Sequence, residues 1–441
     1  MMTLLILALC IVLALAPMAQ ANSAPTHWEG TTAAGLHVDF QECPIVVEHE
    51  TLTFDLGIFP REYYEDESAF TDYWANVTAE YTFRNPTDAD VTMKLLFPFG
   101  IVPQYAPTGR MLPWRYEITL DGEQVSAELR HSLVWGSEFI MTEDSERLHD
   151  GFMEHRFYSP DMPVTRFAFR PKDVSPDSGD WLEARVRLDS DPARTKYILE
   201  PANSLRTEGD HVMAGSSIRE GETAVLYVIG EVPDGELSWE LYVKNEPVEG
   251  TMECVAAEQT TLQEFLLSER PEGSEVSETD WYNALVQLLD RIECSFGYLD
   301  IHNYIELMNW YEYEVTVPAG GTVVNTVTAP MYPDINNGWE PAIYSYDYLL
   351  SPARGWAEFG TLDIEIKTPY YMTQCNLDGF EKTDDGYSLH LEGLPDRELA
   401  FVLSADEHPA RPGTHPIQTG WIIAGLAALI AVGVMRRKRK T

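Results

Sequence analysis

Three tyrosines at alternate positions have the spacing that points most directly to a binding chemistry. Tyr344, Tyr346 and Tyr348 lie within an expected strand, 342–350, so their rings project from one face. Exposed rings in such a row stack on sugars, because an aromatic face is apolar and its hydroxyl forms hydrogen bonds. Buried rings in a row form part of a core instead, which is the commoner arrangement. The sequence leaves both alternatives open, a ligand platform and a core.

The cysteines are the second group that could do chemistry. Four of them follow the apolar amino-terminal segment, namely Cys43, Cys254, Cys294 and Cys375. Cys254 and Cys294 flank the segment in which we expect helices, so a disulfide between them would fasten that segment to the β structure. Closing a loop of this size contributes about 3–4 kcal/mol. We therefore predict this pair, while four cysteines allow three connectivities.

The chain lacks the common sequence motifs for catalysis and metal binding. It contains no H-E-x-x-H, G-x-S-x-G or G-x-x-x-x-G-K pattern. Residues 334–340 place oxygen ligands near a glycine, but they lack the full calcium-loop spacing, and a turn explains them better. No cysteine has the spacing of a zinc ligand. We predict no catalytic residues, no metal site and no cofactor.

The elements that must position these residues are mostly strands. Residues 77–83 alternate apolar and polar side chains, N-P-T-D follows as a turn, and 91–97 alternate again. Asp121-Gly122 between two further alternating runs is typical of a hairpin. Such closely spaced strands predict a mainly β fold of antiparallel, sandwich-like lobes.

Helix is expected in one place only. Thr261 and Glu264 form a capping-box pattern. Further on, an apolar stripe at helical spacing predicts a helix of about four turns; it consists of Trp281, Leu285, Leu288, Leu289 and Ile292. We expect the stripe to pack on the neighbouring β core, with a partner-binding helix as the alternative.

Both ends of the chain carry apolar segments. The first ends in Ala19-Gln20-Ala21, a pattern that signal peptidase cuts, although an uncleaved anchor is the alternative. The second, 417–435, has no charged residue, is about 28 Å long as a helix, and precedes five cations. Because the basic side stays in the cytoplasm, we predict a type I single-pass protein in the cell membrane, with an extracellular ectodomain.

These features divide the chain into eight segments. They are a signal peptide 1–21, an N-terminal β-sandwich-like region 36–135, a further β region 136–250, a helical segment 251–298, a C-terminal β region 299–405, a stalk 406–416, a transmembrane helix 417–435 and a cytoplasmic basic tail 436–441.

The charge of the chain restricts its partners. The formal net charge is −41, from 71 acidic and 30 basic residues. A surface of this charge repels nucleic acid and anionic lipid heads, so nucleic acid is not expected as a partner. The expected partners are the membrane, through the C-terminal helix, and a glycan or protein ligand.

Three stretches carry a resemblance. They are residues 346–372, YDYLLSPARGWAEFGTLDIEIKTPYYM, residues 386–404, GYSLHLEGLPDRELAFVLS, and residues 77–100, VTAEYTFRNPTDADVTMKLLFPFG. They resemble anchored surface proteins of Gram-positive bacteria that contain a domain of unknown function. The tail weakly resembles a sortase sorting signal, but Pro416 and Thr419 are one residue too far apart and His415 replaces Leu. The resemblance implies an extracellular, anchored protein, with cell-wall attachment as the alternative, and it transfers no functional residue.

The expected function follows from these observations. We predict a surface protein with a non-enzymatic binding or structural role. The alternatives are an extracellular hydrolase without a recognisable motif and an accessory or sensory subunit of a membrane complex.

Overall fold

The computed structural model describes most of the expected ectodomain. The described residues are 27–28, 32–34, 36–39, 43–57, 75–100, 117–133, 147–155, 157–174, 181–189, 195–208, 211–219, 221–232, 237–291 and 307–411. The predicted signal peptide, the predicted transmembrane helix, the basic tail and Cys294 lie outside them. Within the described ranges, no helix is long and apolar enough to cross a membrane.

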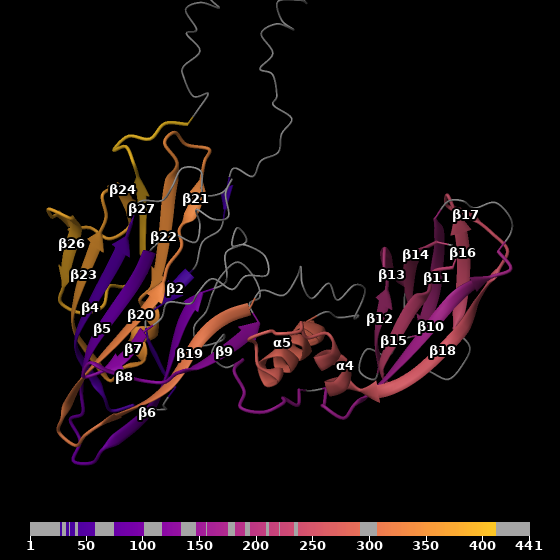
Figure 1. The fold of residues 1–441 in the computed structure, drawn as a ribbon, viewed down its shortest axis with the longest axis horizontal. Coiled ribbons are helices and arrows are strands. Elements are labelled where there is room, and N and C mark those ends of the chain that lie inside the picture. The colour runs from indigo at the N-terminus through magenta and orange to yellow at the C-terminus, as the bar shows by residue number, and fades with distance from the viewer. Residues whose placement is uncertain are drawn as a thin grey trace, which may run out of the picture.

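The described part of the chain is mainly β, as predicted, with antiparallel pairing between most neighbouring strands. Two β lobes lie on either side of the two helices (Figure 1). We call them the first and the second lobe; the first contains both described ends of the chain, and the second is inserted between β9 and β19.

The first lobe contains three sheets. The eight-stranded sheet has the order β25-β26-β23-β4-β5-β20-β7-β8. Its strands are β4 (Val46–Leu56), β5 (Ala75–Arg84), β7 (Glu117–Leu120), β8 (Glu123–Gln124), β20 (Thr322–Pro330), β23 (Glu358–Lys367), β25 (Glu381–Lys382) and β26 (Gly386–Leu391). The six-stranded sheet has β1 (His27–Trp28), β21 (Asp334–Asn336), β22 (Ile343–Leu349), β27 (Leu399–Ser404) and β24 (Tyr371–Cys375) in order, with β2 (Thr32–Ala34) on β22. The third has β3 (His37–Asp39), β6 (Val91–Gly100), β19 (Leu307–Val317) and β9 (Glu128–Leu133) in order, and the short 3-10 helix η1 (Ser351–Gly355) follows β22.

The second lobe contains two sheets. One has β12 (Thr195–Glu200), β15 (Ala224–Gly230), β10 (Pro163–Lys172) and β18 (Thr251–Thr261) in order. The other has β13 (Ser204–Glu208), β14 (His211–Ile218), β11 (Leu182–Asp189), β16 (Ser238–Val243) and β17 (Glu246–Pro247) in order. A buried cluster that includes Val186, Ile218 and Leu226 draws on strands of both sheets. Burial of side chains of this size contributes roughly 1.5–3 kcal/mol each, so this cluster holds the lobe together.

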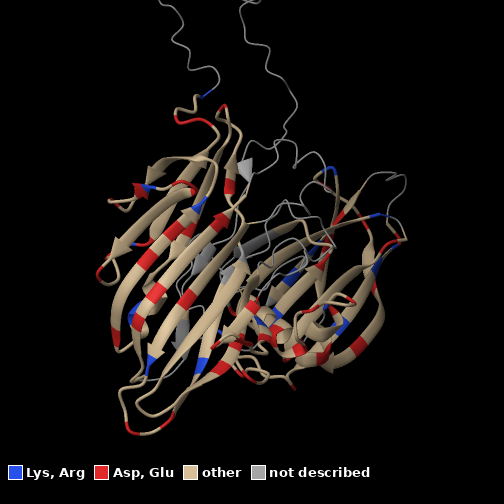
Figure 2. Cartoon of the chain, turned by 60° about the vertical axis from the view of Figure 1, so that its left-hand side comes forward, with Lys and Arg blue, Asp and Glu red and all other residues tan. Residues whose placement is uncertain are grey.

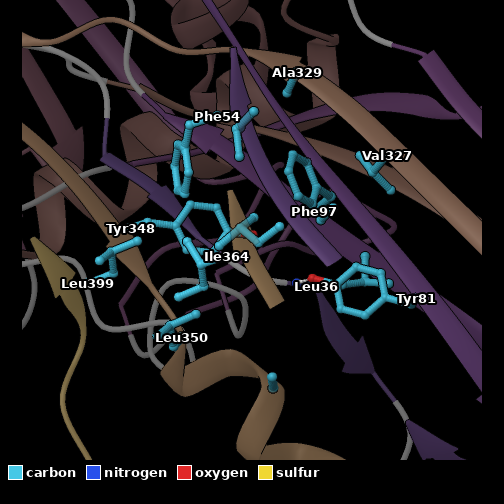
Figure 3. Close-up of a cluster of buried hydrophobic side chains, with 14 of the residues drawn as sticks. Leu36, Phe54, Tyr81, Phe97, Val327, Ala329, Tyr348, Leu350, Ile364 and Leu399 are labelled. Carbon is cyan, nitrogen blue, oxygen red and sulfur yellow. Dashed lines mark hydrogen bonds between the residues drawn. The ribbon is translucent and has the colours of Figure 1, made fainter. Parts of the chain in front are cut away.

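The core of the first lobe follows from the alternation of its strands. Val77, Ala79, Tyr81 and Phe83 on β5 are fully buried, and the intervening residues face outward. Figure 3 shows part of this core, in which Phe54 and Tyr348 lie among aliphatic side chains. The two strands of the predicted pair, β5 and β6, both form, but they belong to different sheets. At the turn between them, the amide of the buried Asn85 side chain donates to Ala89 O and Val317 O.

Strands from the predicted segments 36–135 and 299–405 share the same sheets. β4 pairs with β5 on one side and, in parallel, with β23 on the other, and β19 pairs with β6 and β9. The two segments therefore form one lobe rather than two, because each supplies the neighbours that the backbone groups of the other require. The Asp121-Gly122 turn connects β7 and β8, with both residues at positive φ, as a tight hairpin requires.

The helices are α4 (Leu262–Ser268) and α5 (Glu278–Arg291). The predicted capping box is present: the Thr261 side chain accepts from Glu264 N, and the Glu264 side chain accepts from Thr261 N. Trp281, Leu285 and Leu289 are buried in a cluster with residues of β10, β12 and β15. The four described residues of the stripe therefore pack on the β structure, as predicted, and Ile292 lies outside the described ranges.

Candidate functional site

The three tyrosines of β22 lie inside the first lobe. The exposed fractions of Tyr344, Tyr346 and Tyr348 are 6%, 3% and 0%. Tyr346 stacks on Phe401 at 5.1 Å between ring centroids, and Tyr348 meets the edge of Phe54 at 5.6 Å. Their rings are covered by protein, so this placement favours the core alternative over a ligand platform.

The predicted disulfide cannot be followed in the described residues, because one of its two cysteines lies outside them. Cys254 is a free, exposed thiol on β18, and Cys294 lies outside the described ranges. Seven residues separate Cys254 from Thr261, where β18 meets α4, and along a strand they span about 23 Å. A disulfide needs the Cα atoms of its two cysteines within about 7 Å of each other. Pairing Cys254 with Cys294 therefore requires Cys294 to lie beside β18, well away from the start of α4. It remains a prediction.

A hydrogen-bonded chain of side chains lies on the outer face of the eight-stranded sheet. The register pairs Thr361 with His49 and Asp363 with His390, which brings β4, β23 and β26 together. Asp363 Oδ1 lies 2.6 Å from His390 Nδ1, and Asp363 Oδ2 lies 3.5 Å from His49 Nε2. His49 Nδ1 lies 2.8 Å from Thr361 Oγ1. We call these four residues the His–Asp chain.

The His–Asp chain contains the groups of a nucleophilic triad: a hydroxyl, an imidazole and a carboxylate. Its surroundings do not suit that chemistry. β4 and β23 are paired on both sides, so their backbone N–H groups are engaged in the sheet and are not free to stabilise an oxyanion. Hydrogen bonds to Asp363 and then Glu392 raise the pKa of His390, which favours a charged, pH-responsive surface group.

This face also carries many of the acidic residues of the first lobe. Figure 2 shows Asp and Glu in bands across its strands. Outward positions alternate between threonines such as Thr51 and Thr53 and acids such as Glu80 and Glu365, so the face is rich in hydrogen-bond acceptors. A cluster of acids alone does not define a ligand. Among the described residues, no group of three or more His, Cys, Asp or Glu side chains is placed to hold a metal ion.

A buried carboxyl group lies on the inner side of β4. Glu50 is 1% exposed, and neither of its oxygens has a hydrogen-bond partner of good geometry among the described residues. Burial raises the pKa of Glu50 to about 8, and the nearby Tyr81 hydroxyl lowers it only in part. The hydroxyl of Tyr81 accepts from Leu36 N at 3.1 Å, so this polar site also touches the amino-terminal segment. A carboxyl in such a site is protonated at neutral pH.

Charged side chains join the first lobe to the helices. Arg130 on β9 donates from Nη2 to Asp280 Oδ1 of α5 at 3.1 Å and from Nη1 to Glu312 Oε2 of β19 at 2.9 Å. Asp280 also accepts from the backbone N–H of His131 at 2.9 Å, and both Arg130 and Asp280 are buried. We call Arg130, Asp280 and Glu312 the junction ion network. It positions α5 and carries no reactive group aimed at a ligand.

The sequence contained a signal for one of these sites. Glu50 has the same parity on its strand as Leu52 and Phe54, which face the core, so its burial follows from the alternation. The His–Asp chain has no comparable signal, because its members come together through pairings such as His49 with Thr361, 312 residues apart.

Comparisons with known proteins add little. No family model and no curated protein matches the chain. A crystal structure of a "putative nutrient binding protein" from Legionella pneumophila is similar at 11% sequence identity and a TM-score of 0.38, covering 86% of this chain and 72% of that chain. A similarity at this level supports no inference about fold or function.

Proposed function

We propose that the chain is a single-pass, membrane-anchored surface protein whose acidic ectodomain of β-sandwich-like lobes has a non-enzymatic binding or structural role. The C-terminal helix 417–435 is the anchor, and the ligand is a glycan or a protein.

The position of the two described ends carries this proposal. β1 pairs with β21, which places His27 opposite Asn336. Ala410 forms two backbone hydrogen bonds with Glu340, in the loop that follows β21. Both ends of the chain therefore leave the first lobe beside the end of β21. This is the arrangement that suits a removed leader at one end and a membrane anchor at the other.

The character of the described polar groups supports a binding role. The tyrosines are buried, the junction ion network is structural, and the His–Asp chain lacks free oxyanion donors. What remains are broad sheet faces with hydroxyl and carboxylate groups, which offer many weak hydrogen bonds to a polar ligand rather than one reactive centre.

Two measurements test the proposal. Full-length protein in the producing cell should remain with the membrane after an alkaline carbonate wash and be released by detergent. The ectodomain, 22–416, should bind a component of a glycan or surface-protein array without converting it. Release by carbonate, or turnover of a bound compound, would contradict the proposal.

The hydroxyl–imidazole–carboxylate set favours a hydrolase as the second candidate. In that case the ectodomain should cleave an ester or amide substrate, and Thr361→Val and His49→Gln should each abolish the activity. Activity that survives both substitutions would exclude the His–Asp chain as its source.

A further inference from the structure

The ends of strands β21, β22, β27 and β24 form one edge of the six-stranded sheet, and this edge carries two aromatic side chains, each beside a cation. The Arg411 guanidinium carbon lies 4.8 Å from the centroid of the Trp339 ring, and Lys382 Nζ lies 5.2 Å from that of Tyr371. Tyr371 is 40% exposed and is among the most exposed large hydrophobic residues of the described chain. Trp339 is half-buried, so in each pair an apolar ring lies at least partly at the surface beside a charge.

The sheet register places both rings at this edge. Ser404, at the end of β27, is paired with Tyr371 on one side and with Ile343 on the other. Trp339 lies in the loop just before Ile343, and Arg411 follows the Ala410–Glu340 bridge. Three strand spacings, about 14 Å, separate β21 from β24. We call the four side chains Trp339, Arg411, Tyr371 and Lys382 the rim pairs.

The chain length after Arg411 restricts the distance of this edge from the proposed anchor. Six residues lead from Arg411 to Ile417, where the apolar segment begins. Fully extended, they span at most about 20 Å. The headgroup layer adds several ångströms to the apolar core on each side, so the edge lies near the bilayer surface whenever 417–435 spans it.

The chemistry of the rim pairs fits a lipid surface. Tyrosine and tryptophan concentrate at membrane–water interfaces, where the ring contacts the acyl boundary and the polar group stays hydrated. An adjacent lysine or arginine contacts the phosphate. The same edge also holds Glu340, Asp406 and Glu407, which are exposed acids. They oppose anionic headgroups, so the matching surface is zwitterionic.

We propose that the rim pairs rest on the zwitterionic phospholipid headgroups of the membrane in which the chain is anchored. This inference depends on the proposed membrane anchor, and it assigns the orientation of the first lobe: the edge of β21, β22, β27 and β24 that bears the rim pairs faces the bilayer.

The test uses the full chain reconstituted in phosphatidylcholine vesicles that contain a lipid with a photoactivatable diazirine near its headgroup. After irradiation, mass spectrometry locates the labelled residues. Label is expected on the peptides that contain Trp339 and Tyr371. Trp181 is the matched control, because it is 53% exposed and also stacks with an arginine, Arg219 at 4.3 Å, but it belongs to the second lobe.

The outcomes separate the inference from the proposed function. A chain that stays in vesicles after carbonate but carries no label at the rim pairs, or equal label at Trp181, overturns the orientation alone. A chain that washes off overturns the anchor and the orientation together. Replacing both rings, Trp339→Ser with Tyr371→Ser, should remove the rim label, whereas Trp181→Ser should leave it unchanged.

Discussion

At the scale of single residues, Glu50 has the strongest chemical consequence. Its carboxyl lies in the core beside Tyr81 and Tyr348, and no basic side chain is among the groups that shift its pKa. An ionised carboxylate without a partner is unfavourable in such a site, so the native state keeps the proton to a higher pH than the unfolded chain does.

This difference predicts a pH-dependent stability. Between pH 4.5 and about 8 the native protein holds a proton on Glu50 that the unfolded chain has released, so the free energy of unfolding falls as the pH rises through this window. Glu50→Gln removes the titration. The difference in free energy of unfolding between Glu50→Gln and wild type should therefore grow by roughly 5 kcal/mol from pH 4.5 to about 8. Denaturant unfolding of both proteins at a series of pH values measures it.

A control for this prediction lies on the same strand. Glu48 faces solvent and pairs with Arg84. Glu48→Gln is the matched substitution that leaves the buried Glu50 carboxyl in place, so the pH slope due to Glu50 should persist. If Glu50→Gln shows that slope as well, Glu50 is ionised in the native state and the prediction is wrong.

The buried tyrosines give a second prediction at this scale. Tyr346→Ala removes a ring that stacks on Phe401 in the core and should cost about 3–5 kcal/mol of stability. Tyr371→Ala, at an exposed ring, should cost much less. Thermal unfolding compares the two, and a Tyr346→Ala protein as stable as wild type would argue for a ligand platform.

At the scale of elements, the junction ion network determines how α5 meets the first lobe. Arg130 contacts a fully buried carboxylate and an exposed one, since the side chain of Asp280 is 1% exposed and that of Asp150 is 80% exposed. Removing the buried partner leaves the guanidinium without its main counter-charge in a desolvated site.

Asp280→Asn should therefore destabilise the protein by about 3–5 kcal/mol. Asp150→Asn removes an exposed partner of the same arginine and should cost less than about 1 kcal/mol. Chemical denaturation of the two variants provides the measurement. Equal losses would show that burial does not set the strength of this network.

At the scale of the whole molecule, the first lobe holds both described ends and the second lobe is an insertion between β9 and β19. The segment that follows the second described end is either a membrane anchor or a sorting signal, and these two are processed differently. As an anchor, 417–435 stays in the mature chain. As a sorting signal, it is removed and the ectodomain becomes attached to the cell wall.

We predict that the mature chain retains 417–435, because the spacing from Pro416 to Thr419 does not fit the sortase pattern. Mass spectrometry of the purified protein's carboxyl terminus checks this. A chain that ends at Thr419 would replace the membrane anchor with wall attachment, and the rim pairs would then have no bilayer to face.

The amino-acid sequence by itself determined the features that depend on neighbouring residues. The alternation of 77–83, the Asp121-Gly122 turn and the capping box of Thr261 and Glu264 are all present in the structure. Each involves groups a few residues apart, so the local pattern is sufficient to specify it. The burial of Glu50 follows from the same kind of local pattern, because Glu50 faces the same side of β4 as Leu52 and Phe54.

Only the tertiary structure decided which strands are neighbours. β5 and β6 follow each other in the chain but join different sheets, and β4 finds its parallel partner β23 about 300 residues away. Alternation shows which face of a strand is buried, but it does not specify which strand covers that face or pairs with its edge. For this reason the His–Asp chain, the junction ion network and the rim pairs appear only when distant segments of the chain come together.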